Sequence, residues 1–144
     1  MAELMDYLTQ AVERRASDLF FVAGGSASAK VEGQILPLDG ERLLPPKTEE
    51  LLRALYQLAG RDRDGLLARG DDDFSFSVGG VARFRVNAYR QRGSMAAVVR
   101  VVAFEIPDFQ TLHIPPQVMD LAELTYGMVL VSGSAGSGKS TTQA

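Results

Sequence analysis

Residues 133–140 read GSAGSGKS, and they match the spacing Gly-x-x-x-x-Gly-Lys-Ser of the Walker A loop. Glycines let such a loop turn so that backbone N–H groups point at phosphates, and the following helix start adds partial positive charge. The lysine reaches the β- and γ-phosphates, and the serine hydroxyl completes the coordination of Mg²⁺. We therefore predict an ATP and Mg²⁺ site with Ser140 as the metal ligand. Its predicted nucleotide-binding residues are Gly133, Ser134, Ala135, Gly136, Ser137, Gly138, Lys139, Ser140 and Thr141.

The segment before this loop has the composition that the motif requires. Residues 127–133 (GMVLVSG) form an apolar run typical of a buried strand in a parallel sheet. Strand, glycine-rich turn and helix start then follow one another in the order expected of a phosphate-binding loop. A flexible tail rich in glycine and serine is the alternative, but such a tail would not follow an apolar strand.

Arginine is concentrated in one part of an acidic chain. The net charge is −3, which argues against a general nucleic-acid-binding protein, yet residues 74–104 hold five arginines and no acidic residue. Arginine can bind carboxylates and phosphates through two parallel hydrogen bonds, which lysine cannot do. Residues 74–104 are therefore a second candidate functional segment, in which arginines could bind carboxylates or phosphates.

Three predicted strands carry these arginines. Apolar residues alternate with serine in residues 73–78 (DFSFSV), and Gly79-Gly80 predicts a two-residue hairpin turn. The returning strand, residues 81–91, places Arg83 and Arg85 on the face opposite its apolar side chains. A third strand is predicted over residues 94–102. The arginines are then expected on the open face of an antiparallel sheet.

The remaining segments predict an α+β domain followed by a linker. Amphipathic spacing predicts a helix over residues 3–16, and apolar residues 19–23 predict a buried strand before a glycine turn. Residues 29–38 predict two small strands or one bent strand. Prolines predict a second helix that has Thr48 as its N-cap and ends at Gly60, and a short third helix follows within residues 61–70. Residues 105–116 are rich in proline and predict a linker.

Several other kinds of site are excluded or disfavoured. The chain contains no cysteine, so disulfides and thiolate metal sites are impossible, and His113 alone cannot build a metal cluster. His113 also has no nucleophile signature beside it. Asp71, Asp72 and Asp73 are consecutive, so in a strand they point to alternate faces and cannot converge on one ion.

No apolar stretch is long enough to span a bilayer and no signal peptide is evident, which predicts a cytoplasmic protein.

Four segments together resemble the twitching-motility ATPase family, the retraction motors of type IV pili within the type II and type IV secretion ATPases. They are ASDLFF, DFSFSVGGVARFRVNAYRQRGSMAAVVRVV, LHIPPQV and GMVLVSGSAGSGKSTT, and they occur in the family's order along nearly the whole chain. The resemblance implies a PAS-like α+β domain over residues 1–104, a linker over residues 105–116 and the truncated start of a RecA-like ATPase domain over residues 117–144. Phe20 departs from the family, which has a histidine at that position.

The resemblance also implies an assembly and a location. Members work as ring hexamers in the cytoplasm, at the inner-membrane base of a pilus machine, where an inner-membrane pilus or secretion platform protein is the expected partner. Neither nucleic-acid binding nor membrane insertion is expected. The sequence does not separate a retraction motor from an extension or secretion motor.

In the family, arginines of the N-terminal domain act as arginine fingers on the γ-phosphate. The matching motifs make Arg85, Arg92 and Arg100 the catalytic candidates, with Arg92 and Arg100 favoured over Arg85. Alternatively, these arginines are solvated or paired with Asp71, Asp72 and Asp73. Two functions remain open: a subunit of an ATP-hydrolysing motor, or an assembly and binding module that is not catalytic alone. No acidic motif follows Ser140 in this chain, so we expect the 144-residue chain itself not to hydrolyse ATP. Because the helix start after the loop is too short to be stable alone, we also expect this chain to bind nucleotide poorly.

Overall fold

The computed structural model describes residues 1–102, 108–134 and 137–143. The chain divides into two compact units, residues 1–104 and 105–144. Within the described residues, no helix combines the length and the apolar character needed to cross a lipid bilayer.

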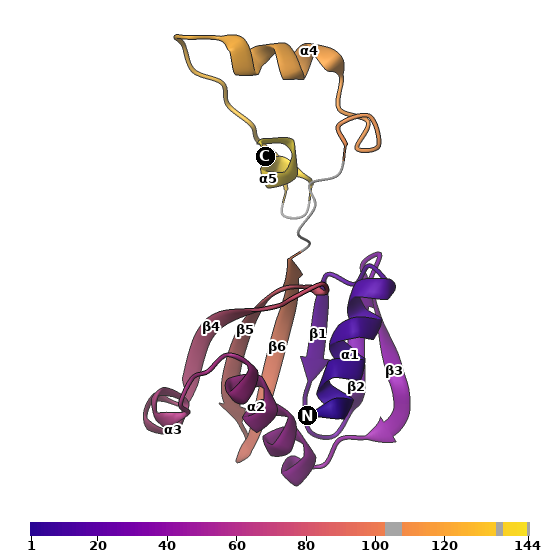
Figure 1. The fold of residues 1–144 in the computed structure, drawn as a ribbon, viewed down its shortest axis with the longest axis vertical. Helices are drawn as coiled ribbons and strands as arrows, with labels where there is room; N and C mark the ends of the chain where they lie inside the picture. Colours follow the sequence, from indigo (N-terminus) through magenta and orange to yellow (C-terminus); the bar gives the residue numbers. More distant parts are fainter. Residues whose placement is uncertain (103–107, 135–136, 144) are drawn as a thin grey trace. The chain divides into compact units, whose positions relative to one another are not determined.

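The first unit is a six-stranded antiparallel sheet with helices on one face (Figure 1). Across the sheet the strands follow the order β3-β2-β1-β6-β5-β4, so the first and last strands of the unit's chain order meet at its centre. The helices are α1 (Ala2–Glu13), α2 (Pro45–Leu58) and α3 (Asp64–Arg69). The strands are β1 (Asp18–Phe21), β2 (Ser26–Val31), β3 (Gln34–Arg42), β4 (Asp71–Val78), β5 (Ala82–Gln91) and β6 (Ser94–Val102).

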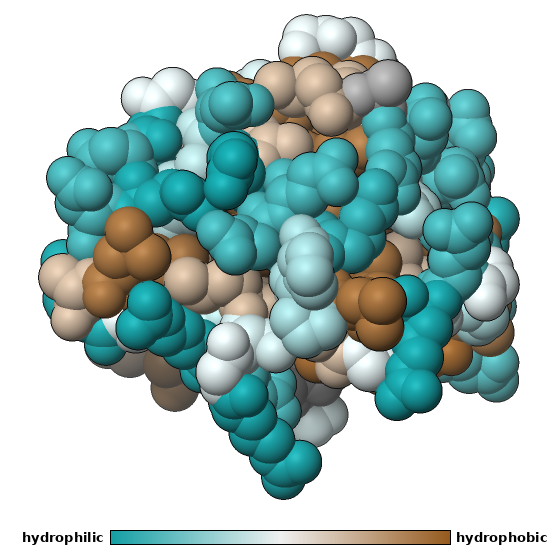
Figure 2. All heavy atoms as spheres, turned by 90° about the horizontal axis from the view of Figure 1, so that it is seen from below, coloured by the Kyte–Doolittle hydropathy of each residue, from teal (hydrophilic) through white to brown (hydrophobic). Residues whose placement is uncertain are grey.

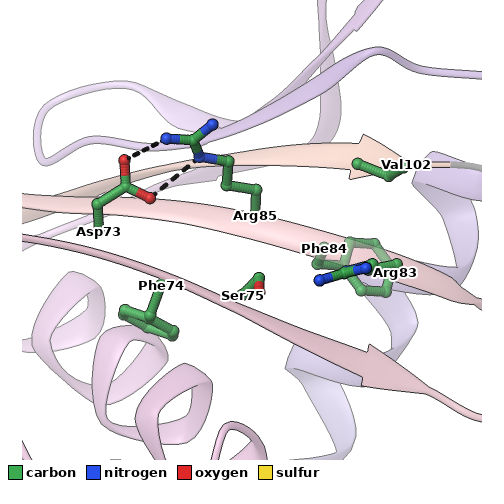
Figure 3. A pocket seen from close by; sticks show the side chains of 7 residues that line it. All are labelled: Asp73, Phe74, Ser75, Arg83, Phe84, Arg85 and Val102. Atoms are coloured by element: carbon green, nitrogen blue, oxygen red, sulfur yellow. Dashed lines mark hydrogen bonds and ion pairs between the residues drawn. The ribbon is translucent and has the colours of Figure 1, made fainter.

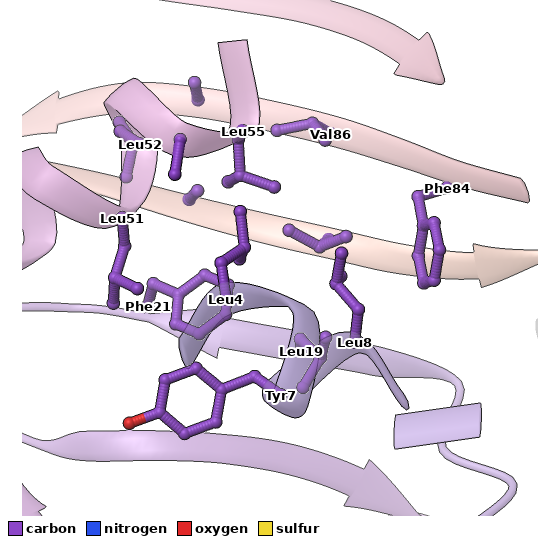
Figure 4. Packing of buried hydrophobic residues seen from close by; sticks show 14 of the residues in the cluster. Leu4, Tyr7, Leu8, Leu19, Phe21, Leu51, Leu52, Leu55, Phe84 and Val86 are labelled. Carbon is purple, nitrogen blue, oxygen red and sulfur yellow. The ribbon is translucent and has the colours of Figure 1, made fainter. Parts of the chain in front are cut away.

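The core lies between the two longer helices and one face of the sheet (Figure 4). Helix α1 places Leu4 and Leu8 against the sheet because residues four apart share one face of a helix, and both side chains are fully buried. Helix α2 contributes Leu52 and Leu55, which are three apart and also share one helix face. Full burial of such a side chain contributes about 1.5–3 kcal/mol to stability. These buried leucines therefore hold the two helices against the sheet.

The sheet's other face is open, and this face carries Arg83, Arg85 and Arg100. Burial alternates along β4 and β5: Phe74, Phe84 and Val86 point into the core, while Arg83 and Arg85 point outward. The predicted alternation in these strands is therefore confirmed. On the side of the molecule drawn in Figure 2, hydrophilic residues dominate and hydrophobic ones form separate patches.

Two details of the predicted elements are wrong. Gly79 and Gly80 form the centre of the β4–β5 turn, but Val78 pairs with Ala82, so Val81 makes the loop three residues long instead of two. Thr48 is not the N-cap of α2: Leu44 is, and the helix begins at Pro45, since proline lacks the N–H that the first turn leaves unpaired. The buried Thr48 hydroxyl instead donates a hydrogen bond of 3.0 Å to the carbonyl oxygen of Pro45.

The second unit contains only short helices among its described residues. These are α4 (Pro116–Met119), the 3₁₀ helix η1 (Asp120–Glu123) and α5 (Lys139–Gln143). The predicted strand over residues 127–133 is wrong, since this segment is irregular, and Met128 and Leu130 are each 84% exposed. A strand needs a neighbour to pair with, and this unit provides none among the residues described. The division into a domain of residues 1–104, a linker and a second domain stays a prediction.

Candidate functional site

Arg85 and Arg100 lie directly opposite each other at the centre of the open sheet face. Arg85 is on β5 and Arg100 is on β6, and the register pairs them. Their side chains are 63% and 65% exposed. Like charges at directly opposed positions destabilise a sheet, so this arrangement is costly unless the guanidinium groups have partners.

Each of the two guanidinium groups has its own carboxylate. Arg85 donates from Nε to Oδ1 of Asp73 over 3.1 Å and from Nη2 to Oδ2 over 2.9 Å, as Figure 3 shows. Arg100 donates from Nε to Oδ1 of Asp18 over 3.2 Å. The guanidinium of Arg85 holds the pKa of Asp73 below its usual range, so that carboxyl stays ionised at neutral pH. The pairing of arginines with the aspartates of 71–73, which the sequence left open, is therefore present for Arg85.

A shallow hollow of about 410 Å³ lies beside Arg85 (Figure 3). Its lining includes Asp73, Ser75, Arg83 and Val102, so it mixes charged, hydroxyl and apolar groups. Arg83 and Arg85 are on the same face of β5 and add positive charge to this region. The lining of this hollow therefore combines one carboxylate with two guanidinium groups.

Arg92 does not join this group. It lies with Gly93 in the two-residue turn between β5 and β6, where Gln91 pairs with Ser94. Arg100 lies six positions after Ser94 along β6, which is roughly 20 Å of strand at about 3.3 Å per residue. One phosphate group therefore cannot contact Arg92 together with Arg85 and Arg100. The structure brings together two of the three predicted arginines and separates the third.

The Walker A segment forms a loop closed by its own lysine. Nζ of Lys139 donates to the carbonyl oxygen of Gly133 over 2.9 Å and to that of Ser134 over 2.6 Å. Helix α5 begins at this lysine, and Gly138 before it has φ +87°, a conformation that favours glycine. The predicted residues Ala135 and Gly136 lie outside the described residues.

The donor set of this loop fits a nucleotide phosphate. It offers the ammonium of Lys139, the hydroxyl groups of Ser140 and Thr141, and the backbone N–H groups that a helix start leaves without partners. A Cβ atom on Gly133 would lie 2.5 Å from Oγ of Ser137, so a side chain at that position would require the Ser137 hydroxyl to move. Of these groups, the Ser140 hydroxyl would hold Mg²⁺ when the ion is bound with nucleotide.

Two acidic residues with specific partners were missed by the sequence analysis. Asp18 enters the sequence prediction only within the segment ASDLFF, although its register places it opposite Arg100. Asp72 is 5% exposed and is the one charged side chain among the buried residues of the described chain. The three consecutive aspartates do alternate between faces, as predicted, and no cluster of metal-ligating side chains occurs among the described residues. Neither the Ser17-Asp18-Leu19 context nor a run of three aspartates shows in the sequence which arginine is the partner.

No protein-family model matches this chain. The type IV pilus ATPase PilU of Pseudomonas aeruginosa is 35% identical over 92% of this chain and 34% of its own length. The type IV pilus retraction ATPase PilT of the same organism is 33% identical over 99% of this chain and 41% of its own length.

The fold agrees with these relatives. The crystal structure of the pilus retraction motor PilT with bound ADP superposes with a TM-score of 0.76 and 40% sequence identity, over 96% of this chain and 40% of that one. The chain therefore spans less than half the length of the relatives it matches. It is a homologue of the PilT and PilU family of type IV pilus ATPases, and it corresponds to the N-terminal portion of these proteins.

Proposed function

We propose that this chain is the N-terminal portion of an ATP-hydrolysing motor subunit that drives the retraction of type IV pili. The observation that carries the proposal is the placement of Arg85 and Arg100 at opposed positions on the open sheet face, in one chain with a Walker A loop. The relatives' names support the same activity, since they describe a pilus retraction ATPase and a motor with bound ADP.

The residues divide into two groups by their chemistry. Lys139, Ser140 and the loop amides would hold the phosphates of ATP and its Mg²⁺, which neutralises charge on the phosphate oxygens. Arg85 and Arg100 would stabilise the charge that spreads over the γ-phosphoryl group as a water oxygen bonds to phosphorus and the bond to the bridging β,γ-oxygen breaks. Guanidinium groups held on a sheet need little reorganisation to do this.

The assembly that we propose supplies these two groups from different copies. In a ring of six subunits, the sheet of one subunit would face the nucleotide bound by its neighbour. The fold would then comprise a PAS-like domain over residues 1–104, a linker over residues 105–116 and the start of a RecA-like domain over residues 117–144. The motor would work in the cytoplasm on an inner-membrane platform protein of the pilus machine.

ATP hydrolysis by the full-length protein that contains this chain tests the proposal. Arg85→Ala and Arg100→Ala should each lower kcat by at least about 100-fold, since arginine fingers contribute factors of about 10³–10⁵. Lys139→Ala should abolish hydrolysis. Arg53→Ala, which removes an exposed arginine that pairs with Glu49 on α2, is the matched control and should leave kcat unchanged. Full hydrolysis by both Arg85→Ala and Arg100→Ala would remove the proposed role of the sheet.

An assembly module without catalysis of its own is the second candidate, and the sequence after Ser140 favours it for the isolated chain. No acidic side chain follows that residue here, whereas phosphoryl transfer needs carboxylates to hold the metal and position water. We therefore expect the 144-residue chain to release no phosphate from ATP above background. Sustained turnover by this chain alone would contradict that expectation.

A further inference from the structure

Asp18 is the partner that holds Arg100, and the two differ sharply in exposure. They lie directly opposite each other on β1 and β6. The side chain of Asp18 is 13% exposed, whereas that of Arg100 is 65% exposed. A largely buried carboxylate thus fixes the inner part of a side chain whose outer end is in solvent.

Both carboxylate oxygens of Asp18 are occupied. Oδ1 accepts the hydrogen bond from Nε of Arg100, and Oδ2 accepts one of 2.8 Å from the hydroxyl of Ser17. The Ser17 hydroxyl lies farther, 3.4 Å, from its other acceptor, the carbonyl oxygen of Lys30. The shorter distance assigns its proton to Asp18, so Ser17 orients the carboxylate.

The backbone beneath this pair is held from both sides. The N–H of Ser17 donates to the carbonyl oxygen of Lys30 on β2 over 2.8 Å, and its own carbonyl oxygen accepts from the N–H of Val101 on β6 over 3.0 Å. Strand β1 lies between β2 and β6 in the interior of the sheet. The backbone that carries the Asp18 carboxylate is therefore held in place on both sides, as it would not be in an exposed loop.

The bond to Asp18 leaves the outer end of Arg100 available. It uses Nε, and the two terminal amino groups have no hydrogen-bond partner among the described residues. These two groups form the planar fork that matches phosphate oxygens. Arg85 differs, because its Nε and Nη2 both bind Asp73, whose side chain is 47% exposed. Of the two opposed arginines, Arg100 presents the complete fork.

We propose that Asp18, oriented by Ser17, is a positioning residue that aims the fork of Arg100 at the γ-phosphate of ATP. This inference rests on the proposed function of Arg100. Without Asp18, repulsion from the opposed Arg85 and the freedom of a long side chain would spread the guanidinium over many positions. The contact to the transferring phosphoryl group would then form less often, while binding of ATP by the Walker A loop would not change.

A double-mutant cycle on hydrolysis by the full-length protein tests this. Asp18→Asn keeps the shape of the side chain and removes its charge, and it should lower kcat about fivefold while KM for ATP changes less than about twofold. Ser17→Ala should lower kcat in the same direction by a smaller factor. In an Arg100→Ala background, Asp18→Asn should have no further effect, because the group that it positions is gone.

Glu49→Gln is the matched control, since it removes an exposed carboxylate that pairs with Arg53 and Arg63 away from the sheet face. It should leave kcat unchanged. Thermal unfolding of each variant shows whether the fold is kept, and Ser17→Ala takes the place of Asp18→Asn if the latter unfolds.

The outcomes separate this inference from the proposed function. An equal loss of kcat from Asp18→Asn with and without Arg100 would overturn the inference and leave the role of Arg100 standing. An unchanged kcat in Asp18→Asn, with a strong loss in Arg100→Ala, would do the same. An unchanged kcat in Arg100→Ala would overturn both.

Discussion

The guanidinium group of Arg61 donates two hydrogen bonds to the buried carboxylate of Asp72, each 2.9 Å long. The hydroxyl of Tyr56 donates a third over 3.0 Å, and Arg69 lies 3.4 Å from the same carboxylate. These partners come from α2, from the loop after it and from the end of α3, while Asp72 is on β4. One carboxylate thus joins three segments to the edge of the sheet.

Replacing this carboxylate should destabilise the fold. We expect Asp72→Asn to lower the free energy of unfolding by about 2 kcal/mol, because it leaves the guanidinium of Arg61 and the hydroxyl of Tyr56 poorly paired. Arg61 is 43% exposed, so solvent compensates part of the loss. Urea unfolding of the chain measures the effect. Asp71→Asn, on the exposed side of the same strand, is the control and should change stability by less than about 0.5 kcal/mol. Equal losses of stability in both variants would contradict the role of Asp72 and its hydrogen-bond partners.

The hydrogen bonds between Arg61 and Asp72 also predict how the stability of the fold depends on pH. Hydrogen bonds from Arg61 hold the pKa of Asp72 below its usual range. A carboxyl group whose pKa is lower in the folded state stabilises the fold above its unfolded pKa of about 3.9, and this contribution is lost as pH falls through the folded pKa. The stability difference between the native chain and Asp72→Asn should therefore be largest at about pH 6 and shrink below about pH 4. Urea unfolding across this range measures it, and a difference that stays constant to about pH 2 would contradict the prediction.

Local patterns in the sequence predicted most of the first unit. Alternation in β4 and β5 and the spacing of apolar residues in α1 depend on the period of one element, so they can be found without knowing its neighbours. Thr48 shows the limit of such reasoning: a good N-cap residue type was present, but Pro45 starts the helix one turn earlier.

Relationships between strands could not be predicted in this way. The opposed positions of Arg85 and Arg100 depend on the β5–β6 register, and the pairing of Arg100 with Asp18 joins residues 82 positions apart in sequence. The strand predicted over residues 127–133 is wrong for the same reason. An apolar run forms a strand only where another strand can pair with it. Long-range pairing, rather than composition, decides which candidate residues meet.

The turn that holds Arg92 should tolerate asparagine better than arginine. Arg92 has φ +49° and precedes Gly93 at φ +82°, and Glu32 and Gly33 repeat this conformation between β2 and β3. Two-residue hairpin turns of this kind favour Asn-Gly, because side chains other than Asn and Asp are strained at positive φ. Arg92→Asn and Glu32→Asn should each raise the free energy of unfolding by about 0.5–1 kcal/mol in urea unfolding.

Hydrolysis gives the second measurement on Arg92. Since Arg92 lies apart from Arg85 and Arg100, Arg92→Asn in the full-length protein should keep kcat within about twofold, as should Glu32→Asn. A loss as large as that in Arg100→Ala would show that the turn contacts nucleotide and that the sheet face alone does not form the site.

The two glycines of the β4–β5 turn should differ in their tolerance of a side chain. Gly80 has φ +73°, whereas Gly79 is outside the positive-φ region, and a Cβ at either position meets no atom within 4 Å. Backbone conformation alone therefore separates them. Gly80→Ala should destabilise the chain by about 1 kcal/mol, while Gly79→Ala should be neutral or slightly stabilising. Urea unfolding of the two variants decides this, and equal effects would show that the turn adjusts to a side chain at Gly80.

Proteolysis should distinguish the two units. None of the described residues of the second unit is buried, and Tyr126 is 91% exposed in an irregular segment with Met128 and Leu130. Tyr56 and Phe74, by contrast, are buried in the first unit with ring centroids 4.6 Å apart. Cleavage requires local opening, which costs little where no apolar contacts are lost. Brief digestion of the 144-residue chain with chymotrypsin should therefore cut first at or near Tyr126 and leave the first unit intact. Mass spectrometry of the fragments identifies the cleavage sites. Early cleavage at Tyr56 or Phe74 would show that the first unit opens as easily as the second.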